Sequence, residues 1–188
     1  ELRRARLALP GAAIVCVCVG NDGDLRAVTL GPKGALAGMK KGAILCDHTT
    51  ASSGVAREIA SAAKSLGIAF LAAPGAGGQE GAKTGLRTIM GGGDAKTFAK
   101  AEPAMRSYGR AVTLMGPVGS GQLTKMVNQI CCVGAIQALA EAMNFATRAG
   151  LDGHKVVDTI SKGAAQSWQM ANRGKTMLEG KFDFGFAV

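Results

Sequence analysis

The expected fold turns on Gly116-Pro-Val-Gly-Ser-Gly-Gln-Leu-Thr-Lys-Met-Val-Asn-Gln129, where the sequence pattern changes from strands to helices. From residue 119 to residue 149 the chain has no proline, and apolar residues recur at helical spacing. Gly150 supplies a helix stop and Asp152 a new N-cap. The pattern predicts a helix of about 30 residues, roughly 45 Å long, which is more than a small domain needs. We expect such a helix to join domains or to lie in a subunit interface.

Lys125, Asn128 and Gln129 stand three and four residues apart and therefore share one face of this helix. An amine and two carboxamides can then converge on one small polar ligand. The same segment nearly matches the phosphate loop G-x-x-x-x-G-K-[ST], but Gln122 stands where the lysine is required. We therefore reject nucleoside triphosphate binding. By residue type alone, a solvated lysine near a helix start is the more frequent case for Lys125.

Before residue 116, short apolar runs alternate with helical patterns. The first run, residues 12–19, is rich in valine and ends at Gly20-Asn-Asp-Gly23, which is typical of a buried strand followed by a turn. The same reasoning predicts strands over 43–46, 68–71, 86–90 and 111–114, and helices from about residue 24, over 52–66 and over 94–105. Alternation of this kind indicates an α/β architecture with a parallel sheet. An all-helical part follows it.

Composition restricts the class of protein. The chain has 188 residues, 47% of them hydrophobic, which excludes disorder. No stretch approaches about 18 uninterrupted apolar residues, so we expect a soluble, cytoplasmic protein with no membrane partner. The net charge of +9 raises nucleic acid or an anionic small molecule as a partner. With 4% aromatic residues and basic residues dispersed beyond Arg6, we expect no nucleic-acid partner.

Cysteines and histidines suggest no metal centre by their spacing. None of the five cysteines belongs to a C-x-x-C motif or has a histidine ladder nearby, so we expect buried free thiols and no metal site. These cysteines are Cys16, Cys18, Cys46, Cys131 and Cys132. His48 follows the second strand, and we expect its side chain to point to solvent and to take no part in catalysis.

Short motifs follow the predicted strands at their carboxyl ends, where doubly wound sheets bind ligands. They are Val19-Gly-Asn-Asp22, Asp47-His-Thr-Thr50 and Ala73-Pro-Gly-Ala-Gly-Gly78. In the same order, they resemble a cofactor-facing turn, a D-x-S-T turn and the D-A-P-V-S-G-G substrate loop of the β-hydroxyacid dehydrogenases. Residues 116–129 resemble the catalytic-helix signature of the same family, and 163–168 and 180–186 resemble its helical domain. The resemblance covers essentially the whole chain.

The resemblance implies a partial Rossmann-like doubly wound sheet in residues 1–115. It also implies an incomplete helical dehydrogenase domain in residues 116–188. It further implies NAD or NADP as cofactor, a small 3-hydroxy acid like 3-hydroxyisobutyrate as substrate, Lys125 as general acid and base, and a homo-oligomer. The implied substrate-binding residues are Gly77, Gly78, Asn128 and Gln129, and the implied cofactor-binding residues are Val19, Gly20, Asn21, Asp24 and Thr50.

Three departures favour an alternative, a truncated and catalytically inactive relative that serves as an oligomerisation or binding module. The dinucleotide fingerprint G-x-G-x-x-G does not follow the first strand. Ala72 and Ala76 stand where the family has an aspartate and a carboxylate-binding serine, and the chain stops at Val188 before the family's K-D-L segment. We therefore expect the chain alone to bind a nicotinamide dinucleotide weakly or not at all.

Overall fold

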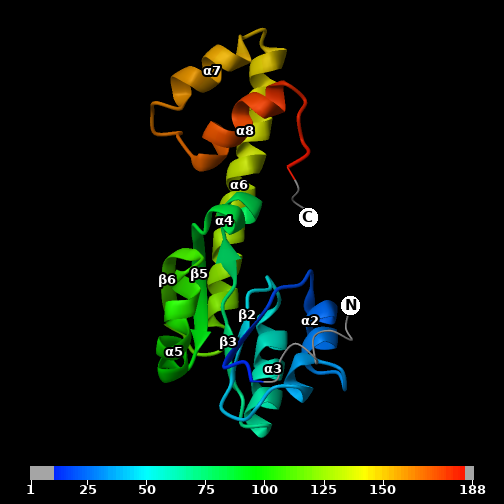
Figure 1. Ribbon diagram of the computed structural model, residues 1–188. Coiled ribbons are helices and arrows are strands. Elements are labelled where there is room, and N and C mark those ends of the chain that lie inside the picture. Colours follow the sequence, from blue (N-terminus) through cyan, green and yellow to red (C-terminus); the bar gives the residue numbers. More distant parts are fainter. Residues whose placement is uncertain (1–10, 185–188) are drawn as a thin grey trace. The chain divides into compact units, whose positions relative to one another are not determined.

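A computed structural model describes residues 11–184 of the chain (Figure 1). The chain divides into two compact units, Glu1–Met126 and Val127–Val188. Helix α6 (Ser120–Arg148) begins in the first unit and continues into the second. It closely matches the helix predicted over residues 119–149.

The first unit holds a sheet with the strand order β1-β2-β3-β5-β4 and with β6 beside β5. Its strands are β1 (Ile14–Val17), β2 (Ile44–Asp47), β3 (Ala69–Ala72), β4 (Gly75–Ala76), β5 (Arg87–Gly93) and β6 (Gly109–Gly116). Its helices are α2 (Asp22–Thr29), the 3-10 helix η1 (Ala35–Ala37), α3 (Ser53–Ser65), α4 (Gly78–Thr84) and α5 (Ala95–Arg106). The predicted alternation of strands and helices is confirmed.

Strand direction differs from the prediction at one junction. β1, β2 and β3 are parallel, and so are β5 and β6, but β5 runs antiparallel to β3 and to β4. The chain therefore continues in one direction through β3 and β4, and α4 turns it back into β5. A parallel return needs a crossover of about a dozen residues or more. The expected parallel sheet is confirmed for β1, β2 and β3 and for β5 and β6, and it is wrong at this junction, because β4 and α4 carry no hydrophobic periodicity that reveals them.

Apolar side chains cover both faces of the sheet. Leu25 of α2 and Val55 and Ile59 of α3 pack with Leu45 and Phe70 on one face. Phe98 and Met105 of α5 pack with Cys46, Leu71 and Ile89 in a second cluster. In Figure 1, α2 and α3 lie together and α5 lies apart from them. Helices on both faces of the sheet confirm the Rossmann-like doubly wound architecture.

Helix α6 meets the sheet at Gly121. A Cβ atom on Gly121 would overlap the carbonyl oxygen of Met90 and lie 2.6 Å from that of Ala72. On the sheet side, a Cβ atom on Gly92 would lie 2.8 Å from the amide nitrogen of Gly121. Two facing glycines thus let the helix backbone lie directly against β3 and β5.

The second unit contains the rest of α6, α7 (Gly153–Ile160) and α8 (Trp168–Leu178). Asp152 and Ser167 cap α7 and α8 by accepting hydrogen bonds from backbone amides of the first turns. Its apolar cluster is formed by Leu139, Met143, Val157 and Met170. Within the described residues, α6 alone is long and apolar enough to span a membrane, and 17% of its most apolar window is buried. Such a helix also occurs in soluble proteins.

The contact at Gly121 generates a stability prediction. We expect Gly121→Ala to lower the free energy of unfolding by about 1 to 3 kcal/mol, because the methyl group has no room beside two carbonyl oxygens. Gly134→Ala on the same helix is the matched control, since its Cβ would meet nothing within 4 Å. The control should stabilise the helix by about 0.5 to 1 kcal/mol. Urea unfolding of both variants tests this, and equal effects would contradict the close approach.

Candidate functional site

The candidate site lies at the carboxyl ends of β1 and β2, which are parallel neighbours. Two turns meet there, and Val19 of the first donates its backbone N–H to Oγ1 of Thr49 in the second over 3.1 Å. Thr49 in turn donates its backbone N–H to Oδ1 of Asp47 over 2.9 Å. These bonds hold the turn of Gly20 beside the turn of Thr50, as expected for residues that share one ligand.

Asp47 and Thr49 are fully buried, and sequence reasoning did not assign them a role in the site. The aspartate at position i and the N–H two residues later form an Asx turn, a signal that D-x-T does contain. Oδ2 of Asp47 is buried without a hydrogen-bond partner among the described residues. Burial raises the pKa of Asp47, and the hydrogen bonds from Thr49 oppose that rise.

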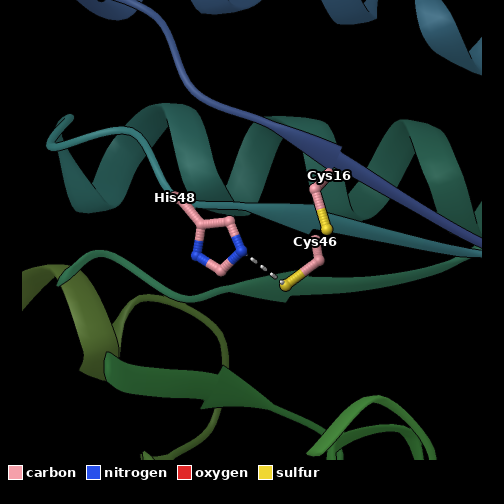
Figure 2. A group of neighbouring side chains, drawn as sticks. All are labelled: Cys16, Cys46 and His48. Atoms are coloured by element: carbon pink, nitrogen blue, oxygen red, sulfur yellow. Dashed lines mark hydrogen bonds between the residues drawn. The ribbon is translucent and has the colours of Figure 1, made fainter. Parts of the chain in front are cut away.

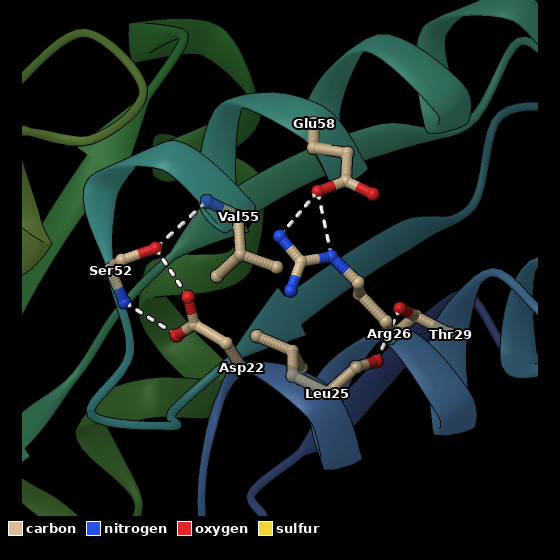
Figure 3. A network of polar contacts seen from close by, with 7 residues as sticks. All are labelled: Asp22, Leu25, Arg26, Thr29, Ser52, Val55 and Glu58. Carbon is tan, nitrogen blue, oxygen red and sulfur yellow. Dashed lines mark hydrogen bonds and ion pairs between the residues drawn. The ribbon is translucent and has the colours of Figure 1, made fainter.

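A polar network joins α2 to α3 (Figure 3). Ser52 donates its backbone N–H to Oδ1 of Asp22 over 2.8 Å and its hydroxyl to Oδ2 over 2.6 Å. The same hydroxyl accepts from the backbone N–H of Val55 and so caps α3. Arg26 pairs with Glu58 at 2.8 Å on the exposed side. The hydrogen bonds from Ser52 lower the pKa of Asp22.

Asn21 and Asp24, both predicted to bind the cofactor, are paired with each other. Oδ1 of Asn21 accepts from the backbone N–H of Asp24, and its Nδ2 donates to Oδ2 of Asp24, both over 2.9 Å. This is the N-cap of α2. Gly20, Asn21, Asp24 and Thr50 are exposed and Val19 is half-buried, so this edge is open to a ligand.

Gln122 connects α6 to the turn after β2. It has no exposed surface; its Nε2 donates to the carbonyl oxygen of Thr49 over 2.9 Å, and its Oε1 accepts from the N–H of Ala51 over 3.2 Å. Sequence reasoning noted Gln122 only as a mismatch to a phosphate loop. The amide thus fastens the helix to both sides of Thr50.

Lys125 lies one helical turn after Gln122 and is 7% exposed. The interpretation of Lys125 as a solvated lysine is therefore wrong. Lys125 is thus buried on the first turns of α6, near Gln122, which is bonded to the turn after β2. Its role in catalysis stays a prediction.

The remaining predicted substrate residues lie in two places. Gly77 and Gly78 are exposed, with φ angles of +126° and +57°, which only glycine adopts easily, and Gly77 precedes α4. Asn128 and Gln129 are half-buried on the part of α6 that belongs to the second unit. There Nδ2 of Asn128 donates to Oε1 of Gln129 over 3.0 Å. The two glycines thus belong to the first unit and the two amides to the second.

His48 is 8% exposed, so the expectation that it points to solvent is wrong. Alternation along the extended chain puts residues 46 and 48 on the same face, toward Tyr108. The ring nitrogen Nδ1 lies 2.7 Å from the carbonyl oxygen of Ala73, and Nε2 lies 2.9 Å from the hydroxyl of Tyr108. The two rings meet edge to face.

The expectation of buried thiols holds for Cys46 and is wrong for Cys16, Cys18 and Cys131, which are exposed. Cys16 lies on β1, the edge strand of the described sheet, and Cys18 follows that strand. Cys16 and Cys46 are partners in register on β1 and β2 (Figure 2). The hydrogen bond to Cys46, followed by that to His48, lowers the pKa of Cys16, while the same contact and burial raise the pKa of Cys46.

The turns at the ends of β1 and β2 lie where doubly wound sheets bind nucleotides. A family model described as the NAD binding domain of 6-phosphogluconate dehydrogenase matches residues 3–116. A second, described as NAD-binding of NADP-dependent 3-hydroxyisobutyrate dehydrogenase, matches residues 119–188. The chain belongs to the β-hydroxyacid dehydrogenase family, as its motifs indicated.

Individual relatives agree with this assignment. The chain is 60% identical to an uncharacterized oxidoreductase of Shewanella frigidimarina, over 96% of this chain and 62% of the relative. It is 32% identical to the 2-hydroxy-3-oxopropionate reductase of Escherichia coli, over 100% of this chain and 64% of that protein. The crystal structure of 3-hydroxyisobutyrate dehydrogenase from Salmonella typhimurium superposes with a TM-score of 0.86 and 30% identity, covering 95% and 62% of the two chains. The chain thus spans less than two thirds of the length of these relatives.

Gln122 gives the second prediction. We expect Gln122→Ala to lower the free energy of unfolding by about 2 to 4 kcal/mol, because it leaves the buried carbonyl of Thr49 and N–H of Ala51 without their partner. Gln137→Ala is the matched control on an exposed stretch of α6 and should change stability by less than about 0.5 kcal/mol. Denaturant unfolding measures both, and similar values would refute the fastening role.

Asp22 gives a pH-dependent prediction. Its lowered pKa means that the network with Ser52 stabilises the fold above the ordinary carboxyl pKa, about 3.9, and is lost as the pH falls through the folded-state value. At pH 7 we expect Asp22→Asn to reduce the free energy of unfolding by about 1 kcal/mol or less, since the site is near solvent. The difference from wild type should shrink at pH 3. A stability difference between Asp22→Asn and wild type that grows toward low pH would contradict the network. Glu80→Gln, on exposed α4, is the control.

Proposed function

We propose that the chain belongs to an NAD(P)-dependent enzyme that transfers a hydride between a nicotinamide cofactor and a small 3-hydroxy acid like 3-hydroxyisobutyrate. The observation that carries this proposal is the burial of Lys125 one turn after Gln122, which is bonded to both sides of Thr50. The site therefore combines an amine with the edge of the sheet at which doubly wound folds bind nucleotides. Membership of the family and the named dehydrogenases among its relatives support the same activity.

The strand-end turns fit the nicotinamide end of NAD or NADP better than its pyrophosphate. Asp22 and Asp24 lie in the first turn of α2, where negative charge opposes a phosphate and suits the positively charged nicotinamide ring. Val19, Gly20, Asn21, Asp24 and Thr50 are the residues that would hold this end. The bound cofactor would supply the hydride acceptor for the alcohol carbon.

Lys125 is proposed to move the proton that accompanies this chemistry. Oxidation of an alcohol to a carbonyl removes a hydride from carbon and a proton from the hydroxyl oxygen, and Nζ of Lys125 would take that proton. In the reverse direction the same ammonium would protonate the forming alkoxide. The backbone amides of Gly77 and Gly78 and the carboxamides of Asn128 and Gln129 are proposed to bind the substrate carboxylate.

A second candidate, a non-catalytic oligomerisation module, is favoured by the exposed apolar side chains of α6. Val127, Ile130 and Val133 are 61%, 73% and 62% exposed. Surfaces of this kind often lie in subunit contacts, so we propose a homo-oligomer whether or not the protein is catalytic. The bacterial oxidoreductases among its relatives support a soluble, cytoplasmic location. Nucleic acid and membranes have no place in the proposal.

The role of Lys125 is tested by Lys125→Ala in the complete gene product. We expect the turnover of 3-hydroxy acids with NAD or NADP to fall at least about a hundredfold, the usual contribution of general acid and base catalysis. Lys100→Ala, on the exposed side of α5, is the control and should leave turnover within about twofold. A loss below about tenfold for Lys125→Ala would contradict the role. Wild-type protein that turns over no 3-hydroxy acid would favour the non-catalytic module.

A further inference from the structure

We propose that Cys16, Cys46 and His48 form a binding site for a thiophilic divalent cation of the zinc class, with the hydroxyl of Tyr108 beside the fourth coordination position. The site lies on β1, β2 and the residue after β2 (Figure 2). It uses none of the residues proposed to bind substrate or cofactor or to transfer a proton. It is therefore a further property of the chain, independent of the oxidoreductase proposal.

The distances suit tetrahedral coordination. The two sulfur atoms and a ring nitrogen of His48 all lie within 4.8 Å of one another, and Sγ of Cys46 is 3.7 Å from Nε2. From zinc bond lengths of about 2.3 Å to sulfur and about 2.05 Å to nitrogen, a tetrahedral site places sulfur and nitrogen about 3.6 Å apart and two sulfurs about 3.8 Å apart. The ligand atoms need to close by no more than about 1 Å to meet this geometry.

The hydrogen bonds of His48 select the tautomer that binds a metal. Nδ1 lies 2.7 Å from the carbonyl oxygen of Ala73, which can only accept, so Nδ1 carries the proton and donates it. Nε2 then presents its lone pair toward Cys46 and Tyr108. A backbone carbonyl in this position is the usual partner of a metal-binding histidine, because it fixes the ring and the tautomer.

The backbone holds the ligands in place before any cation binds. Cys16 and Cys46 are register partners on adjacent parallel strands, so their side chains leave the same face of the sheet. Cys46 and His48 are two residues apart along an extended chain and share that face as well. Cys46 and His48 are buried while Cys16 is exposed, which leaves a side for the cation to enter.

Charge balances at this site. A divalent cation, two thiolates and a neutral imidazole sum to zero, and the two thiol protons pass to solvent as the sulfur bonds form. The hydroxyl of Tyr108 is 2.9 Å from Nε2 and 3.7 Å from Sγ of Cys16, so it can turn from the histidine to the cation or to a water bound there. Two sulfurs and one imidazole are the donor set that zinc and cobalt prefer over magnesium or calcium.

The rival interpretation is a polar network that packs without any cation, since both ring nitrogens of His48 already have partners. A disulfide between Cys16 and Cys46 is a different product and would require an oxidant. The cation site and the cation-free network differ in cation affinity, in stoichiometry and in the absorption of a bound cobalt ion.

The test uses the whole chain, reduced and stripped of metal with a chelator, and titrated first with Co²⁺ and then with Zn²⁺. We expect one Co²⁺ per chain, with thiolate-to-cobalt charge-transfer absorption, and its loss as Zn²⁺ displaces the cobalt. Cys16→Ser, Cys46→Ser and His48→Gln should each weaken binding at least about tenfold. Cys18→Ser and Cys131→Ser are matched controls, because both thiols are exposed and neither is in the cluster, and a serine can keep the contact of Cys18 with it, to the carbonyl oxygen of His48 at 3.8 Å. Both controls should keep the wild-type affinity within about twofold.

Three results would overturn the site. They are a wild-type chain without cobalt–thiolate absorption, binding that survives Cys46→Ser unchanged, and equal loss of binding in Cys18→Ser. Because Cys46 is buried and its variant could unfold, circular dichroism checks that each variant is folded. A second measurement needs only the wild-type chain. Zn²⁺ should slow alkylation of Cys16 at least about tenfold while leaving Cys18 unaffected. If Zn²⁺ leaves the alkylation rate of Cys16 unchanged, the proposal is also refuted.

Discussion

A single buried amide, that of Gln122, fastens the long helix to the sheet. It satisfies the carbonyl of Thr49 and the N–H of Ala51, two polar groups whose burial without a partner would be costly. The amide can reach them only because Gly121 beside it lets the helix backbone lie against the carbonyl oxygens of β3 and β5. Close packing and hydrogen bonding at adjacent positions therefore fix the start of α6 at the ends of the parallel strands.

The candidate site follows from this attachment. Thr50 lies between the two backbone groups that Gln122 binds, and Lys125 follows one helical turn later. Thr49 extends this hydrogen-bonded arrangement, since its hydroxyl oxygen accepts from the backbone N–H of Val19 and so holds the turn of Gly20 and Asn21. Asp22 and Ser52 tie the helices that begin at these turns. The residues proposed to contact the nicotinamide thus share one hydrogen-bonded framework with the start of α6.

Sequence patterns predicted what local periodicity encodes. The valine-rich run of β1 and the proline-free stretch of α6 were both located within a few residues. They could not show that β5 would run antiparallel to β3, because α4 has no apolar stripe to reveal the reversal. Burial of His48 and its contact with Tyr108 depend on residues 60 positions apart. The hydrogen bond of Gln122 to Thr49 spans 73 positions, and local sequence patterns do not reveal such distant contacts either.

The attachment of α6 to the sheet involves the backbone N–H of Ala51, which donates to the side chain of Gln122 in another element. Native-state hydrogen exchange measures that bond directly, because a buried, bonded amide exchanges only when the structure opens. We expect the Ala51 amide to exchange as slowly as the amides in the middle of β2, and at least about a hundredfold faster after Gln122→Ala while those β2 amides stay protected. An Ala51 amide that exchanges in the wild type as fast as an unprotected peptide would contradict the attachment of α6 to the sheet.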